Sequence, residues 1–256
     1  MEMNRVKLGV PVLDKLLPEG LPRRSFVLLA GEGGAGKSFI LTLIASSFLS
    51  RGEKVVYVGL DDDPQTILDG MRTRIPLVDE YLGKGMLKIV DGYTARYGVA
   101  LREGYVEHLR SMDPDVLVST LTSIADREGM RGSGLMIVDS LNPLFWYLEP
   151  TNAYDFIARL RAHIAKSRGV LTVATLHTNT QLFADIASSI EFLVDALIIA
   201  KYNVEALEAG LPVRQILVKR AKGARVSEGW INFIISDEGL VEVKIGKGDV
   251  ERGGSG

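Results

Sequence analysis

A glycine-rich octapeptide at residues 31–38, GEGGAGKS, constrains the fold of this chain more than any other stretch. It directly follows an apolar run at residues 26–30 and directly precedes a long apolar segment that is compatible with a helix. A strand, a glycine-rich loop and a helix in this order form the phosphate-binding P-loop, because glycines let backbone N–H groups approach phosphate oxygens closely. The alternative, a flexible surface turn, does not explain these flanks.

The P-loop pattern assigns a role to each of its residues. Lys37 is expected to reach the β and γ phosphates of a nucleotide, and the Ser38 hydroxyl is expected to ligate Mg²⁺. The loop backbone supplies the remaining contacts. We therefore expect nucleotide contacts from Gly31, Glu32, Gly33, Gly34, Ala35, Gly36, Lys37, Ser38 and Phe39.

Length and composition favour one α/β domain. The 256 residues are enough to bury a sheet on both faces, and 46% hydrophobic with 24% charged residues is typical of a globular protein. No internal repeat and no linker divides the chain. We expect a single domain over residues 1–245, in which residues 1–24 cap the edge of the sheet, and a disordered glycine-rich tail over residues 246–256.

The composition also excludes several classes of protein. No uncharged apolar run is long enough for a membrane span, and residues 1–10 lack the apolar core of a signal peptide, so we expect a cytoplasmic protein without membrane contact. The absence of cysteine excludes disulfides, and the three histidines lack metal-ligand spacing, so any metal should arrive with the nucleotide. A net charge of −2 gives no overall attraction to nucleic acid.

Apolar runs alternate with helical patterns through most of the chain, which predicts a mostly parallel sheet flanked by helices. We expect strands at residues 26–30, 54–60, 86–90, 135–139 and 170–176, and helices at residues 36–51, 64–74, 113–128 and 152–168. After residue 195 the pattern changes to short strands joined by polar turns. These predict carboxyl-terminal antiparallel β-hairpins at residues 196–202, 214–219, 230–235 and 240–244.

Acidic residues stand at the ends of two predicted strands. Asp61, Asp62 and Asp63 follow the second strand, and Asp139 ends the fourth, LMIVD. Ligands of α/β proteins bind at this carboxyl edge of the sheet. Asp139 therefore matches the Walker B acid, which holds a water on Mg²⁺ beside the P-loop, and Asp63 is expected to cap the next helix.

Two further features bear on phosphate chemistry. His177 follows the fifth strand, where it either contacts the terminal phosphate of the nucleotide or simply bonds backbone in a loop. The densest basic stretch is KRAKGAR at residues 219–225. Strand alternation would place Arg220 and Lys222 on one face and Lys219 on the other.

Together these motifs resemble the RecA superfamily of ATPases, and within it the KaiC-like branch that includes archaeal RadA paralogues. The opening LGVPVLDKLLPEGLP is similar to the branch's segment before the P-loop, and YVGLDDDP is similar to its aromatic-V-x-F-E-E-x-P pattern. LMIVDSL resembles Walker B, and VKRAKG followed by INFIISDEGLVEV resembles the closing hairpins. The resemblance spans residues 6–245 and implies a RecA-like P-loop domain.

The resemblance also implies an ATPase that uses ATP and Mg²⁺ in a homo-oligomer, a hexamer or filament, with ATP between neighbouring subunits. Asp61 and Asp62 fall on paired catalytic glutamates, while Arg220 and Lys222 fall on a K-x-R pair that reaches the neighbour's phosphates. With Lys37, these are the expected catalytic residues. Aspartate is shorter than glutamate and the basic pair is reversed in order, so hydrolysis is expected to be slow.

Three other functions fit the sequence. A recombination or repair accessory protein, binding single-stranded DNA or a recombinase partner, would use loops expected at residues 141–152 and 177–189, although both lack Lys and Arg, or the basic stretch at residues 219–225. A KaiC-like autokinase would need a positioned acceptor, for which the tail offers only Ser255. A degenerate ATP-binding scaffold would explain the missing glutamates.

Overall fold

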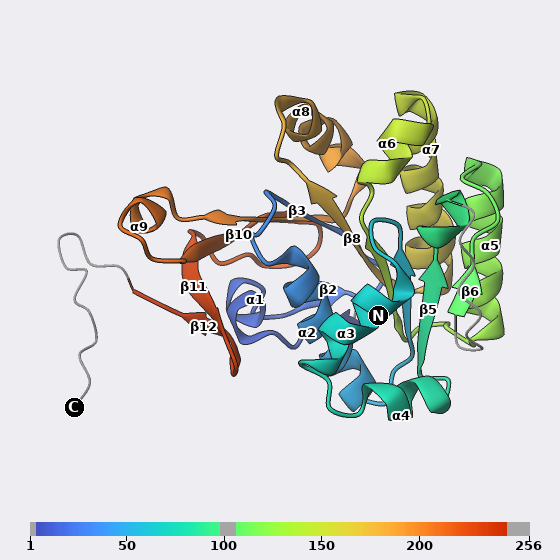
Figure 1. Cartoon of the computed structure of the whole chain (residues 1–256), viewed down its shortest axis with the longest axis horizontal. Helices are drawn as coiled ribbons and strands as arrows, with labels where there is room; N and C mark the ends of the chain where they lie inside the picture. Colours follow the sequence, from blue (N-terminus) through green and yellow to red (C-terminus); the bar gives the residue numbers. More distant parts are fainter. Residues whose placement is uncertain (1–3, 98–105, 245–256) are drawn as a thin grey trace.

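A ten-stranded sheet organises the part of the chain that the computed structural model describes, residues 4–97 and 106–244 (Figure 1). Its parallel strands are, in spatial order, β9 (Ala196–Tyr202), β3 (Phe26–Gly31), β8 (Leu171–His177), β7 (Leu135–Asp139), β4 (Val55–Gly59), β5 (Leu87–Asp91) and β6 (Val106–His108). Antiparallel strands β10 (Arg214–Ala221), β11 (Ile231–Ser236) and β12 (Gly239–Glu242) extend the β9 edge. The predicted tail lies outside the described residues.

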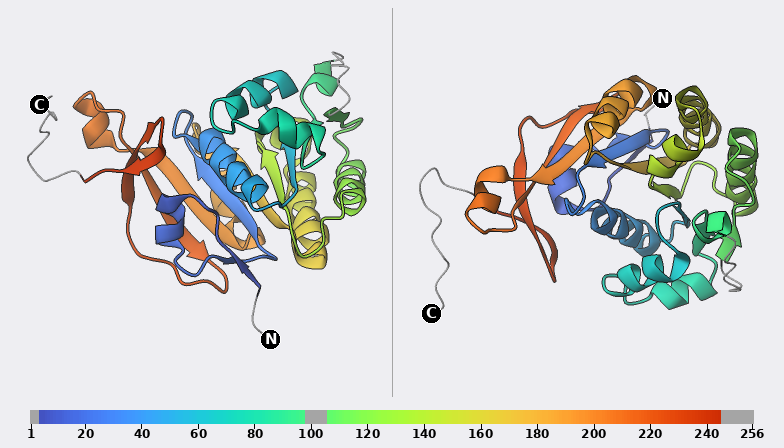
Figure 2. Two further views of the ribbon diagram at one scale, coloured as in Figure 1. Left: turned by 90° about the horizontal axis from the view of Figure 1, so that it is seen from below. Right: turned by 45° about the horizontal axis from the view of Figure 1, so that its top comes forward.

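Helices cover both faces of this sheet, as the two views in Figure 2 show. On one face α2 (Lys37–Ser50), α3 (Pro64–Arg72) and α4 (Val78–Gly83) enclose one apolar core. On the other, α5 (Pro114–Arg127) and α7 (Pro150–Leu160), which continues into a π-helical turn over Arg161–Lys166, enclose a second core. Every residue of β3, β4 and β7 is buried, as expected for central parallel strands covered on both sides.

The amino-terminal segment packs against the hairpin end of the sheet. Its short strands β1 (Arg5–Val6) and β2 (Leu21–Pro22) pair antiparallel, and α1 (Pro11–Leu16) buries Val12, Leu13 and Leu16 in the same core as Ile216 and Leu240. The α/β fold with carboxyl-terminal antiparallel strands agrees with the prediction from the sequence.

Several short elements differ from expectation. The stretches expected to be loops at residues 141–152 and 177–189 contain helices α6 (Asn142–Tyr147) and α8 (Gln181–Ile190). Strand β6, helix α4 and helix α9 (Val204–Glu208) were not predicted, because such short elements carry too few periodic positions. No helix within the described ranges is long and apolar enough to cross a membrane.

The predicted alternation in β10 is also wrong. The pairing of β10 with β9 shifts between Val218 and Arg220, which is the register change of a β-bulge. Lys219 and Arg220 therefore both approach Glu191, with Nζ and Nη1 at 2.6 Å and 4.0 Å from its carboxylate oxygens. The two cations do not lie on opposite faces.

Candidate nucleotide site at the carboxyl edge of the sheet

The P-loop connects the end of β3 to the start of α2. Its glycines are required for two reasons, a close approach of two backbones and positive φ angles. A Cβ on Gly31 would lie 2.0 Å from the carbonyl oxygen of Ala200 on β9, so only glycine fits at this approach of two backbones. Gly34 and Gly36 have φ values of 78° and 90°, in the left-handed region that favours glycine. A side chain at these positions would prevent the close approach or strain the backbone.

Two side chains outside the motif hold this loop. The Asn179 Oδ1 accepts the N–H of Gly33 at 2.8 Å, and the Arg214 Nε donates to the carbonyl oxygen of Gly34 at 2.9 Å. Asn179 follows β8 and Arg214 begins β10, so strands on both sides of β3 brace the loop. Sequence reasoning missed the role of Arg214, because no local pattern indicates that a β10 side chain reaches residue 34.

Lys37 is folded back over the loop. Its Nζ donates to the carbonyl oxygens of Gly31 and Glu32, both at 2.8 Å, and the residue is 3% exposed. Burial lowers the pKa of Lys37 to about 8, against the opposing effect of Asp139, Glu32 and Asp61. The ammonium is thus buried without a carboxylate within ion-pair distance among the described residues, and an anion bound there would raise its pKa.

Asp139 ends β7 beside this lysine and is held by two hydroxyl groups. The Tyr57 hydroxyl donates to Oδ2 at 2.6 Å and the Thr175 hydroxyl donates to Oδ1. The Ser38 hydroxyl, in contrast, is exposed and makes no hydrogen bond with the described part of the chain. Tyr57 was not predicted as part of the site, since it lies inside a strand pattern that indicates only burial.

The oxygen donors fit Mg²⁺ bound together with a nucleotide. Within residues 4–97 and 106–244, no group of three or more His, Asp or Glu side chains could hold a metal by itself. Mg²⁺ commonly takes only one or two protein oxygens, with water and phosphate completing its octahedron. Ser38 and Asp139 would be those two protein ligands, the second through water.

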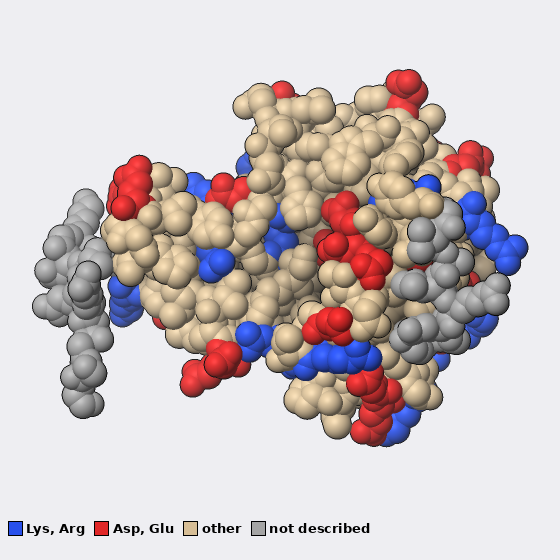
Figure 3. Space-filling view, in the orientation of Figure 1, with Lys and Arg blue, Asp and Glu red and all other residues tan. Residues whose placement is uncertain are grey.

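The three consecutive aspartates have three different environments, although Figure 3 shows acidic side chains gathered on this face between α3 and α6. Asp63 caps α3 as predicted, because its carboxylate accepts the N–H groups of Gln65 and Thr66 at 2.9 and 3.1 Å. Asp61 and Asp62 are not part of that cap. They differ from each other in a way that the sequence does not show.

Asp61 is held in a network. Its Oδ2 accepts the Ser140 hydroxyl and lies 3.4 Å from the Nε2 of His177. Burial alone would raise the pKa of Asp61, but the hydrogen bonds from His177 and Ser140 bring it below its ordinary value. The side chain of Asn142 holds the backbone of His177. Its Oδ1 accepts the His177 N–H at 2.8 Å, and its Nδ2 donates to the His177 carbonyl oxygen at 3.0 Å.

Asp62 is the aspartate without a partner. Its side chain is exposed, and its carboxylate accepts no hydrogen bond from the described residues. Partial burial, and then repulsion from Asp139, Asp61 and Asp63, raise the pKa of Asp62 above its ordinary value. A carboxylate that is free and raised in pKa can accept a proton from water more readily than one that is already hydrogen-bonded.

His177 lies between the P-loop and these acids. In the parallel pairing of β3 with β8 it is the register partner of Gly31, and its ring faces Asp61. The His177 ring therefore makes a specific contact with the Asp61 side chain. The alternative prediction, in which His177 only forms backbone hydrogen bonds in a loop, did not include this contact. Contact with a terminal phosphate remains a prediction.

Arg220 and Lys222 do not lie at this edge. Arg220 is the register partner of Leu197 near the start of β9, and the Lys222 Nζ lies 3.4 Å from the carbonyl oxygen of Phe192. Both are therefore at the amino edge of the parallel sheet, opposite the P-loop of their own chain. The prediction that they act on a neighbour's phosphate stays a prediction.

The aromatic triplet of α6 divides between core and surface. The Phe145 ring packs edge-on against Tyr154 and Phe183, at centroid distances of 5.9 and 6.5 Å. Trp146 and Tyr147 are 65% and 51% exposed. In Figure 3 the surface over α6 and α8 is largely free of charged side chains.

Searches of known proteins find relatives of similar length. The chain is 26% identical over 241 residues to a UPF0273 protein of Aeropyrum pernix, covering 93% of each chain. It is 27% identical over 239 residues to the UPF0273 protein PH0284 of Pyrococcus horikoshii, again covering 93% of each. A UPF0273 protein of Thermotoga maritima is 27% identical over 240 residues, covering 93% of this chain and 96% of the relative.

A solved structure and a family model agree with these matches. The KaiC-like protein PH0186 from Pyrococcus horikoshii superposes with a TM-score of 0.74 over 94% of this chain and 100% of that one, at 20% identity, which shows a shared fold. The model of the family described as "ATPase: KaiC" matches residues 6–247. That match includes the P-loop and the hairpin strands. The chain belongs to the KaiC family of ATPases.

Proposed function

We propose that this protein binds Mg-ATP at residues 31–38 and hydrolyses it slowly, with Asp62 as the base that activates the attacking water. The observation that carries the proposal is the free carboxylate of Asp62, with its raised pKa, at the same strand edge as Lys37 and Asp139. Catalysis of phosphoryl transfer requires positioning, positive charge and an oriented nucleophile. Each requirement has a candidate residue here.

Lys37 supplies the positive charge. Its ammonium is held only by carbonyl oxygens of the loop, so it can exchange them for phosphate oxygens without breaking an ion pair. When bound, Mg²⁺ would neutralise further charge on the phosphates. The backbone N–H groups after Gly31 add donors to the same anion.

Asp61 has a positioning role in this scheme. Because its carboxylate already accepts the Ser140 hydroxyl and faces His177, it is less available to a water than Asp62. It keeps His177 between the P-loop and the acids. The shorter reach of aspartate, compared with the paired glutamates of the family pattern, supports a slow reaction.

A neighbouring subunit would complete the site. Arg220 and Lys222 lie at the opposite edge of the sheet from their own P-loop, so they can act on phosphate only across an interface. Mixing tests this arrangement: Lys37→Ala and Lys222→Glu variants, each inactive alone, should regain activity together. No recovery in mixed oligomers would contradict action between subunits.

Hydrolysis measured with and without single-stranded DNA distinguishes this proposal from the alternatives. We expect phosphate release that depends on Mg²⁺ and Lys37 and is unchanged by DNA. Stimulation by DNA would support the recombination alternative, which has less support because α6 and α8 carry no Lys or Arg and Lys219 is paired with Glu191. Transfer of the γ-phosphoryl group to a side chain of the protein itself, detected by mass analysis, would indicate an autokinase.

A further inference from the structure

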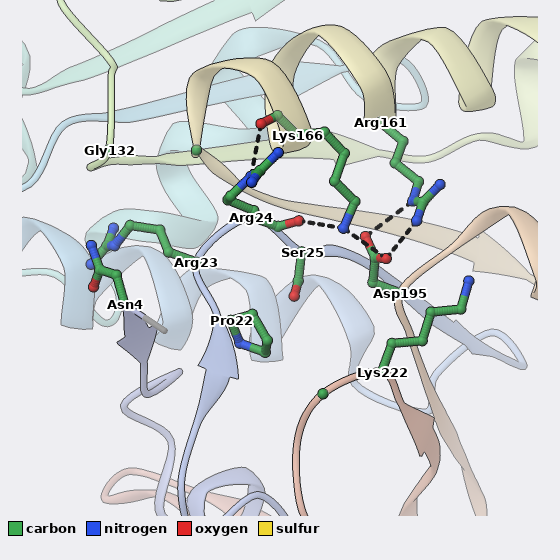
Figure 4. Close-up of a pocket in the computed structure, with 12 residues that line it drawn as sticks. Asn4, Pro22, Arg23, Arg24, Ser25, Gly132, Arg161, Lys166, Asp195 and Lys222 are labelled. Carbon is green, nitrogen blue, oxygen red and sulfur yellow. Dashed lines mark hydrogen bonds and ion pairs between the residues drawn. The ribbon is translucent and has the colours of Figure 1, made fainter. Parts of the chain in front are cut away.

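A second cavity lies at the amino edge of the sheet, and its chemistry is that of an anion site. Its volume is about 720 Å³, within the usual range for small-molecule pockets. Figure 4 shows side chains that line it, from the segments before β3 and β9, the π-helical turn after α7 and the residue that follows β10. Those that the argument uses are Arg24, Ser25, Arg161, Lys166, Asp195 and Lys222.

This cavity is separate from the P-loop of the same chain. Ser25 directly precedes β3, whereas Gly31 ends it, and Asp195 directly precedes the parallel neighbour β9. Six residues of extended strand span about 20 Å. A ligand in the cavity and a nucleotide at residues 31–38 would therefore occupy opposite edges of one sheet.

Positive charge exceeds negative charge in the cavity. Asp195 is its acidic lining residue, and it is 2% exposed. The carboxylate of Asp195 binds Arg161 at 2.7 Å and Lys166 at 2.9 Å, and it also accepts the N–H of Phe26 at 2.9 Å. One negative charge is thus shared by two cations, while Arg24 and Lys222 have no carboxylate within ion-pair distance among the described residues.

Several donors that line the cavity remain unused. The Arg24 Nε donates to the carbonyl oxygen of Lys166 at 2.9 Å, but its two terminal nitrogens make no hydrogen bond within the described chain. The hydroxyl of Ser25, a residue that is 1% exposed, has no partner there either. Burial, and then repulsion from Arg161 and Arg220, lower the pKa of Lys222, which marks a site with uncompensated positive charge.

We propose that this cavity binds a small phosphorylated ligand with at least two negative charges, held by Arg24 and by the Ser25 hydroxyl. Arginine forks match phosphate oxygens in geometry as well as charge. Asp195 does not repel such a ligand strongly, because Arg161 and Lys166 neutralise it. The inference does not depend on hydrolysis at the P-loop.

Calorimetric titration of inorganic pyrophosphate into the full-length Lys37→Ala variant tests the proposal. Every copy of this variant lacks the P-loop lysine, so neither its own P-loop nor that of a neighbouring copy should bind pyrophosphate. We expect one pyrophosphate per chain. Adding Arg24→Glu should weaken binding at least tenfold, and adding Ser25→Ala should weaken it about threefold. The matched control is Lys84→Glu, the same charge change at the exposed residue that follows α4, which should leave the affinity unchanged.

Three results would overturn the proposal. No binding in the Lys37→Ala variant would assign all anion binding to the P-loop. Equal weakening by Lys84→Glu and Arg24→Glu would indicate a general charge effect. Unchanged affinity in both Arg24→Glu and Ser25→Ala, with circular dichroism showing folded protein, would place the ligand elsewhere.

Discussion

The two edges of the parallel sheet bury ions of opposite sign, and they stabilise them differently. At the carboxyl edge Lys37 is surrounded by acids but hydrogen-bonded only to carbonyl oxygens, and its pKa is lowered by burial to about 8. At the amino edge Asp195 binds Arg161 and Lys166 directly; burial raises its pKa, yet these bonds bring it down to about 2. The comparison separates a structural ion, Asp195, from an ion available to a ligand, Lys37.

The largest expected effect is on stability, at the amino edge. Asp195→Ala removes the partner of two cations and of the Phe26 N–H, and should lower the free energy of unfolding by about 3 kcal/mol. Urea denaturation measures this loss. The control Asp79→Ala removes an exposed ion pair with Arg72 and should leave the transition nearly unchanged. Similar losses in both variants would contradict the structural role.

The ion pairs of Asp195 also predict how the stability depends on pH. The folded pKa of Asp195, about 2, is below its ordinary value of 3.8, so its stabilising effect is present above about pH 4 and is lost as the pH falls toward 2. Asp195→Asn should flatten this part of the stability profile.

The next effect is on catalysis, at the carboxyl edge. Asp62→Asn removes the proposed base and should reduce phosphate release about 100-fold without lowering the Tm, since it also removes repulsion with Asp61 and Asp139. In the unsubstituted protein the rate should fall as the pH drops through the raised pKa of Asp62, and the variant should lose that dependence. Asp69→Asn, on the exposed side of α3, is the matched control.

A smaller effect is expected at the adjacent position. Asp61→Asn keeps an oxygen that can accept the Ser140 hydroxyl but loses the charge that faces His177, so phosphate release should fall about tenfold. The acid limb of the pH profile should remain, because Asp62 is intact. A larger loss in Asp61→Asn than in Asp62→Asn would reverse the two assignments.

The sequence predicted the features that are encoded locally. The P-loop, the buried strands and the cap at Asp63 each depend on a short run of residues, and the sheet and the cap appear as expected. Membership of the KaiC family followed from the order of these runs.

What the sequence did not show depends on contacts between distant segments. Arg214 reaches Gly34 across the sheet, and the bulge near Lys219 changes which cations share Glu191. Asp61 and Asp62 are adjacent and chemically identical, so only the positions of Ser140 and His177 distinguish them. Pattern and propensity carry no information about such pairings.

Phosphate release from Mg-ATP, measured on the full-length protein beside its Lys37→Ala and Asp62→Asn variants, tests the central claim most directly. We predict slow release by the unsubstituted protein, lost in Lys37→Ala and reduced about 100-fold in Asp62→Asn while ATP binding is retained. Release no faster than that of Lys37→Ala, from protein that binds ATP, would contradict the claim that the carboxyl edge cleaves nucleotide.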